Sequence, residues 1–394
     1  MTDFQQGIIS LTRAAVTGER TELPDGFSLE RIDAFAKKHQ ISSILLCGIH
    51  TAGLDLTHPA VRKLYTRSVS ELVVSEKQLS DISEVRSLFL KNGISFISLK
   101  GAVLKSLYPK PEMRTMGDID LLIKIDEYKR IKSILIENGY TEIEESDHEI
   151  AWKSPRGCYL ELHKALMPSY HNVYYSYFGD GWSFAERSED SSEYFFTGEV
   201  YFLYVFTHFA KHYRSGGIGI KHLIDLWLYK KHHDKLDFNF IENELQKLNL
   251  LEFYKNICRV EDVWFNCAES DEITDIITST IIKSGAYGTH EARVNAENLR
   301  ISKSENKDVS KFKIFMRKVF PSRSVLEVKY KFLGKFGLLL PVAWVIRWFN
   351  AVFCKRDNIK RHAEDIKSSN REKVLDLEKE LAFVGLKYET KEKL

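Results

Sequence analysis

The sequence predicts an α+β fold in which a small mixed sheet is flanked by N- and C-terminal helical regions. Residues 1–90 carry apolar side chains at helical spacing, and residues 91–168 alternate short strand and helix patterns. Residues 169–294 are again helical in pattern and rich in aromatic side chains. The 394 residues suffice for a sizeable core and several modules.

The N-terminal helical region is most regular near its end, in "ELVVSEKQLSDISEVRSLFLKNG". Its apolar residues recur every three or four positions, at Leu72, Leu79, Ile82, Val85 and Phe89. Gly93 then ends the helix, because glycine readily takes the left-handed conformation that follows a helix.

Residues 91–168 form the predicted α/β core. A strand covers "ISFISLKG", and a brief helix and a proline-marked loop separate it from a second strand, "DIDLLIKI". Another helix runs to the Asn-Gly pair at 138–139. A hairpin of "HEIAWK" and "CYLELHKAL" around the turn "SPRG" completes the core.

Three further segments follow. We expect a helical domain over residues 169–294 and a linker or loop over the polar residues 295–311, which lack an apolar period. Residues 312–394 predict a C-terminal helical region with a charged tail. One amphipathic stripe in that tail predicts packing or a dimer contact: Val374, Leu377, Leu381 and Val384.

The composition excludes several classes of protein. A hydrophobic fraction of 44% and a charged fraction of 28% are typical of soluble globular proteins, and a net charge of +2 does not suggest a nucleic-acid coat protein. The five cysteines form no CxxC pair, which favours a cytoplasmic location over a disulfide framework or a zinc knuckle. The N-terminus shows no signal-peptide pattern.

The most apolar segment, "FGLLLPVAWVI" at residues 336–346, is too short to span a bilayer. A buried helix is the simpler interpretation. The alternative is a weak contact with a membrane surface or a partner through residues 336–349.

Two aspartates, Asp118 and Asp120, begin the second strand of the core. Because side chains alternate across a strand, both carboxylates point to one face, while Ile119 and Leu121 point into the core. Two like charges about 6–7 Å apart repel each other unless a cation lies between them. Oxygen ligands suit Mg²⁺ or Mn²⁺ rather than zinc. The structural alternative is a pair of turn residues or solvated strand positions.

A third carboxylate is needed where two metal ions share ligands. Glu161 is the candidate, because Tyr159, Glu161 and His163 share one face of the strand "YLELH". If this strand neighbours the aspartate strand, Glu161 can face the aspartates. His163 would then help to position the site or contact the acceptor or a phosphate.

The residues before the aspartate strand suggest phosphate contacts. Gly101 lies between a strand and a helix, where the missing side chain lets backbone N–H groups approach a triphosphate. Lys100 and Arg114 can add charge-assisted bonds to phosphate oxygens. For each basic residue, a surface charge is the alternative.

One helix face in the predicted helical domain carries bases. His208, Lys211 and His212 fall at i, i+3 and i+4. They predict a contact with phosphate or acceptor, and the alternatives are a zinc pair or a solvated face. Asp225 would pair with one of the histidines or with Lys221. We expect this segment to close over the core and exclude water from a reacting phosphate.

The stretch "SLKGAVLKSLYPKPEMRTMGDIDLLI" resembles the DNA polymerase β-type nucleotidyltransferase superfamily, with its glycine turn, DxD strand and third carboxylate on a later strand. Within that superfamily the chain is similar to an uncharacterised nucleotidyltransferase family found in many bacteria, also through "LELHKAL" and "HFAKHYRSGGIGIKHLIDLWLY". The resemblance covers roughly residues 30–230. One departure is Ala102, where the superfamily usually has a serine that helps to hold phosphates.

The resemblance implies the transfer of an NMP from an NTP, such as ATP, to an unidentified acceptor hydroxyl. It implies two Mg²⁺ ions held by Asp118, Asp120 and Glu161, with in-line attack at the α-phosphate and loss of pyrophosphate. The acceptor would be a small molecule, a sugar, a protein or an RNA end. The alternative is a non-catalytic nucleotide-sensing or scaffold protein with a degenerate transferase fold, which Ala102 favours and the intact carboxylate trio disfavours.

The paired aspartates also lead to an expectation about stability. Replacing both by asparagine should abolish transfer and keep or raise the stability of the metal-free protein, because it relieves like-charge repulsion.

Overall fold

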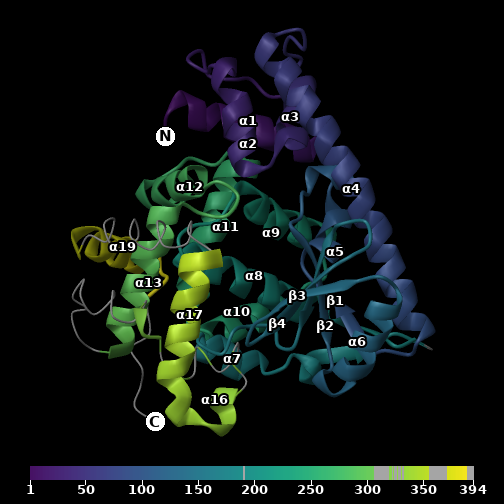
Figure 1. Ribbon diagram of the computed structural model, residues 1–394. Helices are drawn as coiled ribbons and strands as arrows, with labels where there is room; N and C mark the ends of the chain where they lie inside the picture. Colours follow the sequence, from purple (N-terminus) through teal and green to yellow (C-terminus); the bar gives the residue numbers. More distant parts are fainter. Residues whose placement is uncertain are drawn as a thin grey trace.

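A seven-stranded mixed sheet with helices on both faces organises the computed structural model of the chain (Figure 1). The structure describes residues 1–189, 191–305, 319–321, 323, 326, 330, 332–354 and 371–387. The sheet has the order β3-β4-β5-β2-β1-β7-β6. Its strands are β1 (Phe96–Ser98), β2 (Asp118–Ile123), β3 (Thr141–Glu145), β4 (Glu149–Lys153), β5 (Tyr159–His163), β6 (Ala185–Arg187) and β7 (Glu193–Phe196). The mixed sheet and its many helices agree with the predicted α+β class.

The strand that carries the aspartates, β2, lies at the centre of the sheet. It pairs in parallel with β5 and antiparallel with β1. The predicted hairpin is present as the antiparallel pair β4 and β5. Because β2 and β5 are neighbours, residues about forty positions apart in sequence come to lie side by side.

The N-terminal region is helical, as the sequence predicts. Its helices are α1 (Asp3–Thr17), α2 (Ile32–His39), α3 (Ser42–Ala52) and α4 (Pro59–Lys91), with the 3₁₀ turn η1 (Leu29–Arg31). Helix α4 runs along one side of the molecule, from the N-terminal helices to the sheet (Figure 1). It ends at Lys91, and Gly93 has a φ of +60°, the left-handed conformation expected there.

Two apolar clusters cover the two faces of the sheet. On one face, Ile119 and Leu121 pack with Val85 of α4 and Leu135 of α6. On the other face, Leu122 joins the large core built by the N-terminal and C-terminal helices. The short elements between the strands are α5 (Gly101–Leu104), η2 (Lys105–Leu107), η3 (Pro111–Met113), η4 (Ile125–Glu127), α6 (Tyr128–Glu137), α7 (Asn172–Phe178) and η5 (Trp182–Phe184).

The sheet extends beyond residue 168, so the predicted helical domain over residues 169–294 is wrong for its first part. Strands β6 and β7 form a hairpin, and β7 pairs in parallel with β1. The segment "EYFF" is followed directly by a helical pattern of similar composition, so the sequence pattern predicts helix for the whole stretch. The boundary is set at Thr197, whose hydroxyl accepts a hydrogen bond from the Val200 N–H and caps the following helix.

The remaining part of that region is helical as predicted. Its helices are α8 (Gly198–Arg214), α9 (Ile220–His232), α10 (Phe238–Lys247), α11 (Leu251–Phe265), α12 (Glu272–Ser284) and α13 (His290–Glu305).

Helix α13 replaces most of the predicted linker. Residues 295–305 are helical, and residues 306–311 lie outside the described residues. The helix packs against α19 (Arg371–Phe383), and its buried side chains include Asn295, Asn298 and Leu299. Val294 and Ala296 are buried as well, so the buried side of this helix mixes small, polar and apolar residues and shows no regular apolar period in the sequence.

The apolar segment near residue 340 is exposed, and the buried-helix interpretation is wrong for it. It forms α16 (Phe332–Lys335), η6 (Gly337–Leu339) and α17 (Leu340–Cys354). Leu338 is 97% exposed and Phe349 is 63% exposed. Among the described side chains of α17, Ala343 is buried and the Trp344 indole N–H donates to the Pro321 carbonyl at 2.9 Å.

The amphipathic stripe of the tail packs inside the chain. Leu381 and Val384 are buried, and Val374 and Leu377 pack against the same core. The packing alternative of the prediction is therefore confirmed. Within the residues that the structure describes, no helix is both long and apolar enough to cross a membrane.

Candidate functional site

Three carboxyl groups meet on one face of strands β2 and β5. In the parallel register Asp120 lies opposite Glu161, and Asp118 lies two positions earlier on the same face. Ile119 and Leu121, which alternate with the aspartates, are buried on the opposite face. The period of two in both strands thus brings Asp118, Asp120 and Glu161 together.

Asp118 and Glu161 share a proton. The charge of Asp120, followed by burial, raises the pKa of the Asp118 carboxyl. Burial and the charges of Asp118 and Asp120 raise the pKa of Glu161 to about 9. Glu161 is therefore protonated at neutral pH, and its interaction with Asp118 opposes the rise of the Asp118 pKa. A divalent cation at this place would displace that proton.

Asp120 stays ionised because it has two partners. Its Oδ1 accepts hydrogen bonds from Lys100 Nζ at 2.7 Å and from His163 Nε2 at 2.8 Å. Burial acts to raise the pKa of Asp120, but the Lys100 charge and the His163 hydrogen bond hold it well below its usual range. Asp120 also holds the pKa of the Lys100 amine above its ordinary value, although burial opposes this.

The turn between β1 and α5 holds Lys100 over the carboxylates. Lys100 has φ +42° and ψ −119°, a conformation that is strained for any residue except glycine. The Tyr201 hydroxyl of α8 donates to the Lys100 carbonyl at 3.3 Å. A Cβ on Gly101 would lie 2.4 Å from Met116 Sδ, so this glycine lets the turn pack against the loop before β2. The structure thus gives Gly101 a packing role, and its phosphate contact stays a prediction.

A basic face of α8 lies across from the carboxylates. His208, Lys211 and His212 are half-buried rather than exposed, and their contact with phosphate or acceptor stays a prediction. The charges of Glu149, Asp120 and Glu161 all act on Lys211, which places its amine on the carboxylate side of α8. Figure 1 shows α8 beside the sheet.

Burial lowers the pKa of all three basic groups on this face, and Lys211 still carries most of its charge at pH 7. Burial and the charge of Lys100 lower the pKa of Lys211 to about 8. Burial and the charge of Lys211 lower the pKa of His208 and of His212 well below the usual histidine value. The two histidines face each other with their Nε2 atoms 3.0 Å apart. Among the described residues they join no third metal-ligating side chain.

Two residues near the site are missed by the sequence prediction. Glu149 lies opposite His163 in the β4–β5 pair. Burial acts to raise the pKa of Glu149, but the hydrogen bond and the charge of His148 lower it to about 2. Counting back from the "SPRG" turn would have found this pairing. Burial and the Lys211 charge lower the pKa of His171 to about 3. His171 precedes the short helix α7, and no periodic pattern marks it.

Arg114 has a partner other than phosphate. Its Nε donates to Asp225 Oδ1 at 2.6 Å, and the Tyr108 hydroxyl donates to the same oxygen at 2.8 Å. Arg114 is 6% exposed, and Asp225 raises the pKa of its guanidinium against the effect of burial. Asp225 therefore holds the Arg114 guanidinium in a buried ion pair, and the nucleotide contact of Arg114 stays a prediction. Asp225 accordingly pairs with Arg114 rather than with a histidine or with Lys221.

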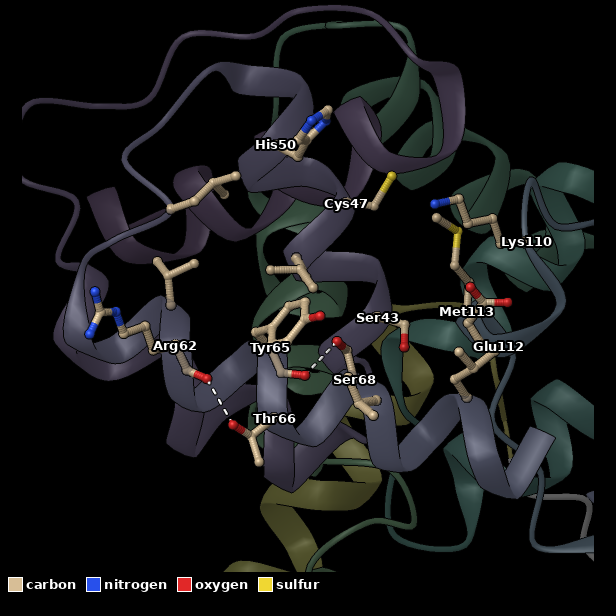
Figure 2. A pocket seen from close by; sticks show the side chains of 15 residues that line it. Ser43, Cys47, His50, Arg62, Tyr65, Thr66, Ser68, Lys110, Glu112 and Met113 are labelled. Atoms are coloured by element: carbon tan, nitrogen blue, oxygen red, sulfur yellow. Dashed lines mark hydrogen bonds between the residues drawn. The ribbon is translucent and has the colours of Figure 1, made fainter. Parts of the chain in front are cut away.

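A large pocket lies elsewhere, between α3 and α4 (Figure 2). It has a volume of about 750 Å³. Cys47 and His50 of α3 line it, as do Lys110 and Glu112 of the loop before β2. No residue of the predicted site lines this pocket, so it is separate from the carboxylate cluster.

The donor atoms of the cluster fit a divalent cation. One oxygen each from Asp120 and Glu161 and one nitrogen of His163 lie within 4.8 Å of one another. Asp118, bonded to Glu161, adds a third carboxylate beside them. Oxygen-rich sites of this kind suit Mg²⁺ or Mn²⁺. The shared proton of Asp118 and Glu161 supports the same interpretation, because a cation removes the repulsion that the proton relieves.

Fold and site together define an α+β protein with a buried carboxylate cluster at the centre of a mixed sheet, opposite a basic helix. A comparison with family models gives the family. The chain belongs to the uncharacterised nucleotidyltransferase family, whose model matches residues 25–266. This range includes the whole sheet and helices α8 to α11. No curated protein and no solved structure matches the chain. Family membership supports a function in nucleotidyl transfer, and such enzymes generally use divalent metals.

Proposed function

We propose that the protein is a metal-dependent nucleotidyltransferase with a polymerase β-type core, which moves an NMP from an NTP to an acceptor hydroxyl. The observation that carries this proposal is the meeting of Asp118, Asp120 and Glu161 on one face of two parallel neighbouring strands. The acceptor is a small molecule, a sugar, a protein or an RNA end. A cytoplasmic location stays a prediction from the cysteine usage.

Asp118, Asp120 and Glu161 would hold Mg²⁺ or Mn²⁺. When bound, the metal would neutralise phosphate charge and lower the pKa of the acceptor hydroxyl. Glu161 then loses the proton that it shares with Asp118. Its free carboxylate can accept the proton of the acceptor hydroxyl as that oxygen attacks.

Lys100 changes partner in this proposal. Its amine now neutralises Asp120 at 2.7 Å, a place that a metal can take over. Lys100 can then turn to the β- and γ-phosphates and compensate for the serine that Ala102 replaces. The strained backbone at Lys100 and the glycine after it fix where the amine can reach.

The basic face of α8 would receive the phosphates from the other side. Lys211 regains a full charge beside a phosphate, and His208 or His212 can donate a hydrogen bond. Bond making and breaking are balanced: the acceptor oxygen joins the α-phosphorus, and the bond to the pyrophosphate oxygen breaks. Helix α8 also shields the reaction from water.

The direct test is incubation of the protein with each labelled NTP, Mg²⁺ or Mn²⁺ and cell extract, followed by identification of the labelled species. We expect one nucleotide to label one class of acceptor, and Asp118→Asn to remove the label. Lys129→Met is the matched control, because Lys129 is exposed on α6, on the other face of the sheet. This variant should keep the labelling activity. Labelling that persists in Asp118→Asn would assign the activity to a contaminant.

A second candidate is a non-catalytic nucleotide-sensing or scaffold protein. The Lys100–Asp120 ion pair favours it, because this pair neutralises one carboxylate without any metal. Such a protein would gain thermal stability with NTP and Mg²⁺ yet transfer no label to any component of the extract. Labelling at any acceptor would exclude it.

Residues 336–349 support a secondary proposal, contact with an anionic membrane surface. Their apolar side chains are exposed, and residues 311–361 contain thirteen Lys or Arg residues against two acidic ones. The full-length protein should float with vesicles that contain anionic lipid and not with neutral vesicles. Leu338→Asp with Phe349→Asp should abolish flotation. A protein that stays with the pellet fraction in both cases would point to a protein partner instead.

A further inference from the structure

A histidine pair and a glutamate meet beside the carboxylate cluster. Glu149 begins β4 and pairs in register with His163, the last residue of β5. His148 immediately precedes the strand. One ligand atom from each of His148, Glu149 and His163 lies within 4.8 Å of the other two.

The distances suit a metal with nitrogen ligands. Glu149 Oε2 lies 3.1 Å from His148 Nε2 and 3.9 Å from His163 Nδ1. In a tetrahedral site with metal–nitrogen bonds of about 2.0–2.1 Å, neighbouring ligand atoms are about 3.3 Å apart. Small side-chain rotations would therefore bring all three atoms to one ion.

An independent observation points to a ligand here. His163 is 2% exposed, and its Nδ1 has no hydrogen-bond partner among the described residues. Its Nε2 is bonded to the ionised Asp120, which fixes the proton on Nε2 and leaves a lone pair on Nδ1. That lone pair faces the carboxylate of Glu149, which can offer no proton. A buried acceptor of this kind needs a partner, and a cation is the partner that both groups attract.

The second histidine is oriented in the same way. Its Nδ1 lies 2.8 Å from Asp147 Oδ1, which leaves Nε2 directed at Glu149. Asp147 is itself held by the Ser169 hydroxyl at 3.0 Å. Each histidine thus has an aspartate on the nitrogen that points away from the glutamate. Carboxylates in this position orient metal-binding histidines and make them stronger ligands.

We propose that His148, Glu149 and His163 form a second metal site, which takes a transition metal of the zinc class. Two imidazoles and one carboxylate suit Zn²⁺, whereas the carboxylate-rich cluster next to it suits Mg²⁺. Three protein ligands leave a fourth position for water or substrate, as in open zinc sites. This proposal does not depend on nucleotidyl transfer.

The test is a zinc titration of the chelator-stripped full-length protein in competition with a chromophoric chelator. We expect one tight equivalent of Zn²⁺, and His148→Gln and Glu149→Gln should each weaken it by at least about 100-fold. His50→Gln removes an exposed histidine of α3 and should change nothing. The visible spectrum of the Co²⁺-loaded protein should show four-coordinate metal in the parent and lose it in both variants.

Two results would overturn the site. One is the absence of tight zinc binding in the parent, which would leave His148 as a proton-bearing bridge between Asp147 and Glu149. The other is unchanged zinc affinity in both variants, together with its loss in Asp118→Asn, which would place the metal in the carboxylate cluster. Zinc binding that survives in an Asp118→Asn protein without transferase activity separates this site from the proposed function.

Discussion

The acidic face of the sheet and the basic face of α8 both bury charged groups, but the two faces lower the cost of that burial differently. On the sheet, one carboxylate is kept charged by Lys100 and His163, and the other two share a proton. On α8, burial lowers the pKa of His208, Lys211 and His212, so the two histidines are neutral at pH 7 while Lys211 stays mostly charged. The acidic face therefore carries a fixed ion pair. The histidines of the basic face are neutral and can gain a proton when an anion binds beside them. We therefore expect loss of the Lys100–Asp120 pair to reduce stability more than a change on α8.

The largest effect should come from Asp120→Asn. This change leaves the Lys100 amine in a buried place without its counter-charge, so the free energy of unfolding should fall by about 3 kcal/mol. Transfer should fall by at least about 100-fold. Urea unfolding and labelled-nucleotide assays measure the two effects. The sequence alone predicts that replacing both aspartates keeps or raises stability, and the Lys100 ion pair makes us expect the opposite sign for Asp120.

Asp118→Asn should separate activity from stability. Its carboxyl is destabilised by Asp120 and by burial, so asparagine should keep or raise the stability of the metal-free protein by up to about 1 kcal/mol. Transfer should still be lost. Equal destabilisation by Asp118→Asn and Asp120→Asn would mean that the Lys100 ion pair does not make Asp120 more important for stability than Asp118.

Lys211→Met should have a smaller effect, limited to the basic face. It removes a like charge near Lys100, so the metal-free protein should keep its stability, while the KM for NTP rises by about tenfold. Lys129→Met serves as the control on an exposed position of α6. If KM is unaffected and only kcat falls, Lys211 contacts the transition state rather than the bound nucleotide.

The smallest effect is on the pH dependence of stability. The pKa of each of His208, His212 and His222 is lowered in the folded chain, so the unfolded chain binds more protons below pH 6.5 and stability falls on acidification. The Glu161 pKa is raised from 4.5 to about 9, so its contribution is lost as pH rises towards 9. Stability should therefore pass through a maximum near pH 6.5.

Urea unfolding in chelator at several pH values checks this. Between pH 6.5 and 8 the slope should be negative, at most about 1.4 kcal/mol per pH unit for one group, and Glu161→Gln should remove it. Added Mg²⁺ should reduce this slope of stability against pH. A slope that Glu161→Gln leaves unchanged would mean that another group carries the proton.

The local parts of the site could be predicted from the sequence, and the long-range contacts could not. The shared face of Asp118 and Asp120 follows from strand alternation, and that of His208 and His212 from helix spacing. The pairing of β2 with β5 joins residues that no local pattern connects. The ion pair of Arg114 with Asp225 spans 111 positions, so the sequence could not distinguish it from a phosphate contact.

The same limit applies to the fold. Glu193–Phe196 has the composition of the helix that follows it, and only pairing with β1 makes it a strand. In α13, the buried residues mix Asn295 and Asn298 with Val294, Ala296 and Leu299, so the hydrophobic pattern shows no clear helical period. Tertiary contacts overrule local preference at both places.

The place of β7 in the sheet has a consequence for the solubility of shortened chains. A fragment that ends at residue 168 would keep β1 and β2 but lose the strand that pairs with the other side of β1. The N–H and C=O groups of β1 would then form an open edge lined by apolar residues, which recruits strands from other copies. Residues 193–196 therefore protect the isolated core from aggregation, and a soluble minimal fragment has to extend past them.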